Sequence, residues 1–383
     1  MSSDTKGRMP PGSRRPTKSV CLIGLGNIGS PLASLLARLT DLVDRIILVD
    51  NDSYDWSNLS SQEIGSRDVG RPKAIATAER LHQINPRLEA VPLQGKVEWL
   101  PRAMLRADVI LAALDSLRAR TFVNEIATRL AVPWVDTGVE PDGRLARVTV
   151  YRPDSDGPCM ECGLTAAHYD TMDHALPCAG DSSDALAGEA PSTRAPAYLG
   201  ALAASLAAAE CEELLAGDID GSLARRELVV SAKYHTHFVT NLGRNPNCRF
   251  DHSTWSPEKL VARPHDISVG QVLDGRLLAG RPGGRDTSVE LRVEPHRFVT
   301  RTRCGRCRNV GDDLFLSGRP ANPPCSVCGG SRVPQHFYTL DRLTADALPD
   351  HLRRQSLADI GLQRGDLFSI SSGTAERHFE LGV

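Results

Sequence analysis

The first third of the chain holds residue types that can bind the phosphates and the ribose of a nucleotide. A glycine-rich loop runs from Gly24 through Gly26 to Gly29, between a short apolar segment and a segment with helical periodicity. Glycines at this spacing let backbone N–H groups approach a phosphate at the amino end of a helix. Asp50 ends the next apolar segment, where a carboxylate can hydrogen-bond a ribose hydroxyl. These residues alone would fit NAD as well as ATP.

Two further residues favour ATP and chemistry at its phosphates. Lys73 stands near an expected helix start, from which its ammonium group can reach a phosphate as a mobile point charge. Asp115 follows an expected strand, and open α/β sheets bind ligands at the carboxyl ends of their strands. One carboxylate together with substrate phosphates is a usual way of holding Mg²⁺. A dehydrogenase needs neither residue, although Lys73 could instead be a solvated lysine and Asp115 the N-cap of the next helix.

Short apolar runs alternate with segments of helical periodicity along the first 136 residues. This alternation predicts an α/β fold, with a Rossmann-like, mostly parallel sheet covered by helices on both faces. We expect strands at 19–23, 45–49, 88–92, 108–113 and 133–136, and helices at 27–39, 72–85 and 118–130.

The pattern changes after residue 136. Period-2 alternation predicts an antiparallel strand at 144–151, whereas residues 163–194 are polar, show no periodicity and are expected to form a mobile loop. An alanine-rich helix should start near residue 195, followed by a hairpin of strands at 227–232 and 235–241. We expect a flexible tail at 1–17, a nucleotide-binding domain at 18–253, and a small β-rich accessory domain at 254–383.

Six of the ten cysteines form three Cys-x-x-Cys pairs. In a long chain this usage is typical of metal binding in a reducing compartment rather than of disulfides. The last two pairs have 17 residues between them, which predicts a zinc ribbon at 304–328. Four thiolates leave no open position for a substrate, so this zinc should be structural. The expected ligands are Cys304, Cys307, Cys325 and Cys328.

Over about residues 18–252 the chain resembles the ThiF/MoeB/HesA superfamily, which includes the ubiquitin-activating enzymes. The residues that carry the resemblance are the glycine loop, Asp50-x-Asp52, Ser57-Asn58-Leu59, Gln62, Val69-Gly70-Arg71-Pro72-Lys73, Asn85-Pro86, Asp115, Arg120 and Asn124.

The resemblance implies that residues 18–253 form an adenylation domain. In this family the C-terminal glycine of a β-grasp protein attacks the α-phosphate of Mg-ATP and becomes an acyl adenylate. By resemblance, Asp50 and Asp52 belong to the nucleotide site and Asp50 holds the ribose. Asp115 would bind magnesium, and the remaining residues would line the phosphates: Asn58, Gln62 and Lys73. Lys73 and Asp115 would thereby assist the reaction.

One position departs from the family pattern. The family usually has arginine before the glutamine, and this chain has Ser61. A cation for the triphosphate could come from Arg14 or Arg15 in the tail, or from Arg67 or Arg71.

The resemblance also implies a second zinc site. Cys159 and Cys162 form the first Cys-x-x-Cys pair, and family members with zinc carry another pair after a hairpin. Here the second pair is reduced to Cys248 and a histidine, and Cys-x-x-x-His is acceptable zinc spacing. We therefore expect Cys159, Cys162, Cys248 and His252 as ligands, with Asp251 as the alternative to the histidine.

The remaining cysteines are Cys21, Cys178 and Cys211. Cys21 and Cys211 lie in apolar segments and are expected to pack in the core. The position of Cys178 in the polar loop matches a catalytic or accessory cysteine of the family. As a thiolate, Cys178 would attack the acyl adenylate and form a thioester. The alternative is an inert exposed thiol.

Bulk properties exclude several classes of partner. The 383 residues carry a net charge of −2, which gives no sign of nucleic-acid binding. The longest apolar stretch, near 195–209, runs into glutamates and predicts a buried helix, not a membrane span. No secretory signal is visible, so we expect a cytoplasmic protein. The expected cofactors are ATP, Mg²⁺ and two structural Zn²⁺ ions.

The leading hypothesis is activation of a ubiquitin-like protein, with transfer to a conjugating-enzyme-like acceptor. The extra zinc-bearing domain and the absence of a sulfurtransferase segment favour a bacterial conjugation system, a class associated with antiviral defence. A homodimer is expected from the family. The alternatives are activation of a sulfur carrier of the molybdopterin or thiamine type, adenylation of a peptide or tRNA, an NAD-binding oxidoreductase, and a non-catalytic scaffold.

Overall fold

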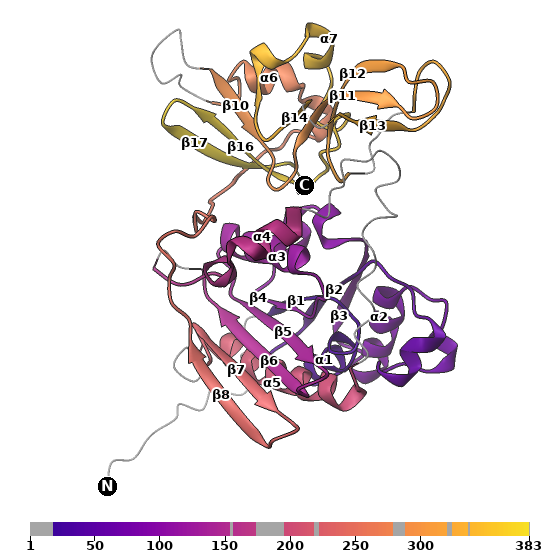
Figure 1. The fold of residues 1–383 in the computed structure, drawn as a ribbon, viewed down its shortest axis with the longest axis vertical. Helices are drawn as coiled ribbons and strands as arrows, with labels where there is room; N and C mark the ends of the chain where they lie inside the picture. Colours follow the sequence, from indigo (N-terminus) through magenta and orange to yellow (C-terminus); the bar gives the residue numbers. More distant parts are fainter. Residues whose placement is uncertain are drawn as a thin grey trace.

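Eight strands form the sheet that carries the predicted nucleotide-binding residues (Figure 1). The computed structural model describes residues 18–153, 156–173, 195–217, 222–278, 288–319, 324–335 and 338–382. The strand order is β3-β2-β1-β4-β5-β6-β7-β8, parallel from β3 to β5 and antiparallel from β5 to β8. The strands are β1 Ser19–Ile23, β2 Arg45–Asp50, β3 Glu89–Gln94, β4 Val109–Ala112, β5 Trp134–Glu140, β6 Leu145–Tyr151, β7 Arg226–Ser231 and β8 Thr236–Asn241.

Helices cover both faces of this sheet, as the alternation of elements predicts. One face carries α1 (Gly29–Leu36), α2 (Lys73–Ile84) and α5 (Ala197–Ala216), and the other carries α3 (Leu117–Arg129). Short 3₁₀ helices fill the connections: η1 Trp56–Ser60, η2 Ser66–Asp68, η3 Val97–Trp99, η4 Arg102–Leu105 and η5 Met160–Gly163.

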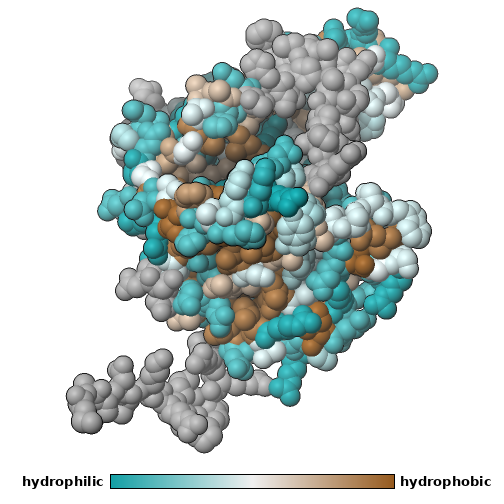
Figure 2. All heavy atoms as spheres, turned by 60° about the horizontal axis from the view of Figure 1, so that its bottom comes forward, coloured by the Kyte–Doolittle hydropathy of each residue, from teal (hydrophilic) through white to brown (hydrophobic). Residues whose placement is uncertain are grey.

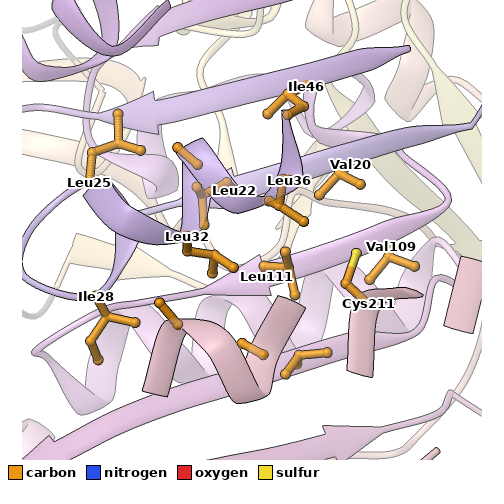
Figure 3. Close-up of a cluster of buried hydrophobic side chains, with 14 of the residues drawn as sticks. Val20, Leu22, Leu25, Ile28, Leu32, Leu36, Ile46, Val109, Leu111 and Cys211 are labelled. Atoms are coloured by element: carbon orange, nitrogen blue, oxygen red, sulfur yellow. The ribbon is translucent and has the colours of Figure 1, made fainter. Parts of the chain in front are cut away.

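The inner strands are apolar on both sides because both of their faces are covered. Val20 and Leu22 of β1 point toward α1 and α5, where they pack with Leu36 and Leu32 of α1 (Figure 3). The alternate β1 residues Cys21 and Ile23 pack on the α3 side. Period-2 alternation of the strand thus divides one apolar run between two cores.

The two cysteines expected in the core are buried. Cys21 lies in β1 and Cys211 in α5, and both are fully shielded from solvent. Burial raises the pKa of the Cys21 thiol to about 12 and that of Cys211 still further. Neither thiol is a nucleophile at neutral pH.

The expected loop over 163–194 is wrong at its start, where residues 166–173 form α4 (Ala166–Asp173). The sequence of this helix has no amphipathic period to predict it, and tertiary contacts hold it instead. The Tyr169 hydroxyl donates to Glu161 at 2.8 Å, and the Arg249 guanidinium lies 4.0 Å from the centre of the Tyr169 ring. The rest of the expected loop lies outside the described residues.

The C-terminal part is β-rich, as predicted, and has its own apolar core drawn from residues 267–381. One sheet has the order β15-β10-β16-β17-β9, and in the other β11 pairs with β12, β13 and β14. The separate core supports the division near residue 253, which stays a prediction. The elements are β9 Glu258–Lys259, η6 Pro264–Asp266, α6 Val269–Leu273, β10 Val289–Arg292, β11 Phe298–Cys304, β12 Val310–Leu316, β13 Arg332–Pro334, β14 Thr339–Leu340, β15 Leu343–Thr344, η8 Ala345–Ala347, α7 Asp350–Arg353, β16 Leu367–Ser372 and β17 Ala375–Glu380.

Buried arginines join the two parts of the chain. Arg129, the last residue of α3, pairs with Asp251 at 2.6 Å and with Glu294 at 2.9 Å. Its guanidinium also lies 4.8 Å from the ring centre of Trp255. On the C-terminal side, Arg319 donates to the Trp99 carbonyl at 2.5 Å. Charges buried in this way must be paired, so these contacts fix the relative position of the two parts.

Within the described residues, none of the helices combines the length and the apolar character that crossing a membrane requires.

Candidate nucleotide site and metal centres

The glycine loop lies where the chain passes from β1 into α1. Gly24 has a φ of +89°, and a Cβ atom there would lie 2.4 Å from the Ala113 carbonyl oxygen. A Cβ atom at Gly29 would lie 1.8 Å from the Gly24 carbonyl oxygen. At Gly26, in contrast, no atom lies within 4 Å of such a Cβ. Two of the three glycines are therefore required by the packing of the chain, and Gly26 faces open space at the amino end of α1.

Strand pairing brings the other predicted residues to the same edge of the sheet. β1 lies between β2 and β4, with Ile23 opposite both Val49 and Ala112. The Gly24 N–H donates to the Val49 carbonyl at 2.9 Å. The strand order reverses at this point, because the chain leaves β1 for β2 on one side and reaches β4 on the other. In open α/β sheets, such a reversal leaves a crevice for ligands.

Asp50 holds the glycine loop through the backbone. Its two carboxylate oxygens accept the N–H of Leu25 at 2.7 Å and the N–H of Asp52 at 2.8 Å. Burial raises the pKa of the Asp50 carboxyl, and the nearby Lys73 ammonium and these two N–H groups partly offset the effect. Each carboxylate oxygen retains a further lone pair, so the group can also accept a ligand hydroxyl.

Lys73 is the first residue of α2 and is only 7% exposed, so the alternative of a solvated lysine is wrong. Its Nζ lies 3.0 Å from Asp52 Oδ2, and its backbone N–H donates to the Asp52 carbonyl. Burial favours the neutral amine, but the carboxylates of Asp50 and Asp52 outweigh burial and raise the pKa of Lys73. Lys73 is therefore a cation at neutral pH, held between two acids beside the glycine loop.

Asn58 and Gln62 belong to the segment around η1. Asn58 helps to cap the start of this 3₁₀ helix, because its Oδ1 accepts the backbone N–H of Asp55, the N-cap residue, at 3.0 Å. The Oε1 atom of Gln62 is buried and has no hydrogen-bond partner among the described residues. Buried acceptors are normally satisfied, so this atom marks a place where a ligand donor or water would bind.

The expected arginine substitutes have different surroundings. Arg71 is engaged with Glu79 at 2.6 Å and with Asp68, and Arg67 is exposed. Arg14 and Arg15 lie outside the described residues.

A fifth arginine, Arg80, was not predicted from the sequence to belong to this site. Its guanidinium donates to the backbone carbonyls of Ser30, next to Gly29, and of Glu63, next to Gln62. Arg80 follows Lys73 by seven residues, two helical turns along the same face of α2, which is the signal that could have found it. It positions the glycine loop against the segment after η1.

Asp115 lies three residues beyond β4 and is exposed. The N-cap of α3 is Ser116, whose hydroxyl accepts the Ala119 N–H at 3.0 Å, so the alternative that Asp115 caps this helix is wrong. Arg120 holds the preceding turn by donating to the Leu114 carbonyl and pairing with Asp136. The Asp115 carboxylate forms no hydrogen bond or ion pair with any described residue and is free to bind a cation.

The first metal cluster contains the four predicted ligands. The donor atoms of Cys159, Cys162, Cys248 and His252 all lie within 4.8 Å of one another. His252 Nε2 lies 3.4 Å from Cys159 Sγ and 3.5 Å from Cys162 Sγ. A tetrahedral zinc with bonds of about 2.0–2.3 Å requires ligand separations of this size. Asp251, the alternative ligand, points elsewhere and pairs with Arg129.

The second cluster contains the four cysteines of the predicted ribbon, also within 4.8 Å of one another. Cys304 Sγ lies 3.5 Å from Cys328 Sγ, and Cys307 Sγ lies 3.7 Å from Cys325 Sγ. The backbone N–H groups of Arg306 and Cys307 donate to Cys304 Sγ. These donors lower the pKa of the Cys304 thiol to about 6. Four cysteine sulfurs at tetrahedral separations fit a zinc ion.

The predicted nucleophile Cys178 lies outside the described residues. Its proximity to the nucleotide site therefore stays a prediction.

Comparison with known proteins gives one family match. The sequence profile of the ThiF family matches residues 14–250. The sulfur carrier protein ThiS adenylyltransferase of Escherichia coli is 32% identical over 146 residues, which are 37% of this chain and 57% of that protein. The sulfur carrier protein adenylyltransferase of Thermus thermophilus is 30% identical over 240 residues, 60% of this chain and 80% of that protein.

More distant matches are similar in kind. Ubiquitin-like modifier-activating enzyme 5 of Dictyostelium discoideum is 25% identical over 163 residues, 38% of this chain and 41% of that protein. Among solved structures, Escherichia coli MccB with AMPCPP and MccA has a TM-score of 0.48 at 22% identity, over 61% of this chain and 66% of that chain. The chain thus spans less than two thirds of the length of several relatives.

Proposed function

The chain belongs to the ThiF family, and from this premise we propose that it uses Mg-ATP to adenylate the C-terminal glycine of a ubiquitin-like β-grasp protein. One observation carries the proposal. The strand reversal beside β1 gathers an open glycine, a buried lysine cation and an unpaired aspartate at one edge of the sheet. A binding site for NAD needs neither of the last two.

The proposed reaction is an attack of the glycine carboxylate on the α-phosphorus of ATP. A carboxylate oxygen forms a bond to phosphorus, the bond to the bridging oxygen breaks, and pyrophosphate leaves. Negative charge shifts onto the leaving pyrophosphate, where Lys73 and the backbone N–H groups near Gly26 can stabilise it. Asp115 would hold Mg²⁺, which neutralises phosphate charge when bound. Asp50 would fix the ribose, and Gln62 Oε1 would accept a donor of the nucleotide.

We further propose that Cys178 then takes the acyl group. Its thiolate would attack the adenylate carbonyl carbon, form a thioester and release AMP. The acceptor would be a conjugating-enzyme-like protein in a bacterial conjugation system, and the defence role stays a proposal. Non-reducing intact-mass analysis with Mg-ATP and a β-grasp protein ending in glycine tests this step. A thiol-labile adduct on the wild type, missing from Cys178→Ala, supports it.

A second candidate is activation of a sulfur carrier without a thioester on Cys178. The names of two relatives, both adenylyltransferases for sulfur carrier proteins, favour this function for those proteins. Carrier-dependent pyrophosphate release by Cys178→Ala at the wild-type rate, with no adduct on either protein, would favour it here.

Calorimetric titration with nucleotides separates adenylation from the oxidoreductase alternative. We expect the wild type to bind Mg-ATP and not NAD, and Lys73→Met to lose most of its affinity for ATP. Lys259→Met is the matched control, because Lys259 is exposed in β9, which belongs to the separate C-terminal sheet. Binding of NAD without binding of ATP would overturn the proposal.

We also propose a homodimer through the face of α5 and the β7–β8 hairpin. All six residues of β8 are exposed, and a groove of about 630 Å³ lies between α5 and the hairpin. Figure 2 brings forward the side of the molecule where α1, α5 and β8 are labelled in Figure 1, and hydrophobic residues gather on it. The lining is mainly aliphatic: Leu202, Leu206, Leu228, Val230 and Val239. Apolar side chains gathered on one exposed face support a contact with a partner at this face.

Sedimentation velocity tests the dimer. We expect Val239→Asp, at an exposed apolar position of β8 that lines this groove, to convert a wild-type dimer into monomers. Val261→Asp, at an exposed valine outside this face, should leave the dimer intact. A monomeric wild type at micromolar concentration would refute the dimer without bearing on adenylation.

A further inference from the structure

The zinc ribbon carries an excess of positive charge at its tip. Residues 297–335 contain seven arginines and two aspartates. Four of these arginines have acidic partners, in ion pairs of Arg297 with Asp341, Arg301 with Asp312, Arg319 with Asp366 and Arg332 with Asp313. The other three, Arg303, Arg306 and Arg308, are exposed and pair with no described acidic residue. The free charges are thus concentrated at one end of the ribbon.

The three free arginines lie within one hairpin turn. Arg303 is near the end of β11, and Arg306 and Arg308 are in the turn that leads to β12. The turn is tied by two backbone hydrogen bonds, from Cys304 N–H to the Asn309 carbonyl at 2.8 Å and from Arg308 N–H to the Cys304 carbonyl at 3.1 Å. The predicted zinc ligands lie in and behind this turn. The arginines are therefore presented by a rigid support.

Exposed aliphatic side chains stand among these charges. Arg303 is opposite Val310 of β12 and opposite Val333 of β13, so the three side chains share one face of the sheet. Val310 is 49% exposed, and Val327, in the neighbouring Cys-x-x-Cys turn, is 67% exposed. This end of the ribbon thus exposes valine side chains as well as arginines.

We propose that this surface, defined by Arg303, Arg306, Arg308, Val310 and Val327, docks an acidic segment of a partner protein that also carries aliphatic side chains. Arginine guanidinium groups recognise carboxylates in bidentate geometry, and the valines offer apolar contact between them. The inference does not depend on the adenylation reaction.

A nucleic acid fits this surface less well. Sequence-independent binding to single strands combines a basic track with exposed aromatic rings for base stacking. Among the described residues next to the ribbon, Tyr338 is the large exposed aromatic side chain, and the Arg301 guanidinium already lies 4.5 Å from its ring centre.

The test measures binding of defined probes to the full-length, zinc-loaded protein by fluorescence anisotropy. The probes are a labelled peptide that alternates glutamate with leucine, the same peptide with glutamine for glutamate, and a single-stranded RNA of similar length. The surface variant replaces Arg303, Arg306 and Arg308 with serine. The matched control makes the same three changes at exposed arginines elsewhere in the C-terminal part that have no described acidic partner: Arg276, Arg354 and Arg364.

We expect the acidic peptide to bind the wild type and the control equally, and the surface variant at least about tenfold more weakly at low salt. The glutamine peptide should bind all three proteins more weakly than the acidic peptide binds the wild type. Zinc content and unfolding midpoint, measured on each variant, establish that the ribbon is folded. Equal binding of the acidic peptide by the surface variant would overturn the proposal. Tighter, arginine-dependent binding of the RNA would replace it with a nucleic-acid site.

Discussion

Lowering the pH should weaken the contact between the two parts of the chain through one histidine. The Nε2 atom of His296 accepts a hydrogen bond from Arg319 Nε at 3.3 Å, and its Nδ1 lies 3.0 Å from the Ser317 carbonyl. The imidazole is thus neutral, with its proton on Nδ1. Burial first, and the positive charge of Arg319 second, lower the pKa of His296 to about 4. Protonation would place an N–H group against the Arg319 donor.

The size and sign of the effect follow from proton linkage. The ordinary pKa of histidine is about 6.5, so below that pH the unfolded chain binds a proton that the folded chain excludes. Stability from this residue is complete above pH 6.5 and is lost as the pH falls toward 4. Between pH 7.5 and pH 5, a folded pKa of about 4 corresponds to a loss of about 2 kcal/mol in the free energy of unfolding.

Denaturant unfolding of wild type and His296→Gln at several pH values measures this loss. Glutamine does not titrate and can still accept from Arg319, and both proteins share every other titrating group, including the zinc ligands. Trp99 and Trp255 lie at the contact and report its opening by fluorescence. His265→Gln, at an exposed histidine, is the control for the substitution itself.

The stability advantage of wild type over His296→Gln should shrink by about 2 kcal/mol between pH 7.5 and pH 5. If that difference stays constant within about 0.5 kcal/mol, the histidine is not held neutral by the contact, and the reasoning is refuted.

Three further predictions concern the glycine loop, the buried Arg129 that joins the two parts of the chain, and the two metal clusters. Gly24→Ala should destabilise the fold by about 1–3 kcal/mol, because its φ is positive and its Cβ would meet a carbonyl oxygen; Gly26→Ala should melt like wild type yet bind ATP more weakly by calorimetry. Arg129→Met should lower the free energy of unfolding by about 1–3 kcal/mol, because it removes one of the two cations paired with the buried Glu294, whereas Arg118→Met on the exposed side of α3 should change it by less than about 0.5 kcal/mol. Elemental analysis should find two zinc ions per chain, and one in Cys304→Ser.

The sequence predicts the parallel strands well because their physical signal is local. Strands that are buried on both faces, such as β1 and β4, are short apolar runs in the sequence. The end of another such run, β2, predicts the position of Asp50. The four predicted ligands of the zinc ribbon have a local signal too, in the spacing of two Cys-x-x-Cys pairs, whereas those of the first metal cluster were expected from the family resemblance. His252 and Asp251 could not be separated by spacing; their neighbours decide, because Arg129 engages the aspartate.

What the sequence missed depends on tertiary contacts. Helix α4 has no amphipathic pattern and is held by Tyr169 and its partners, so its residues resemble a loop. The burial and pairing of Arg129 could not be predicted from the sequence. Local sequence does not distinguish an arginine that joins two parts of a chain from one on the surface. Arg80 was overlooked although its helical phase with Lys73 was available in the sequence.

The central claim is that the site at the ends of β1, β2 and β4 makes an acyl adenylate. Exchange of labelled pyrophosphate into ATP, measured with a β-grasp protein ending in glycine, tests it most directly, because the exchange requires reversible formation of the adenylate. We expect exchange that needs both the carrier and magnesium, and that falls at least about 100-fold in Lys73→Met, as for loss of a transition-state charge contact. Undiminished exchange in Lys73→Met, or NAD binding in place of ATP binding, would contradict the account.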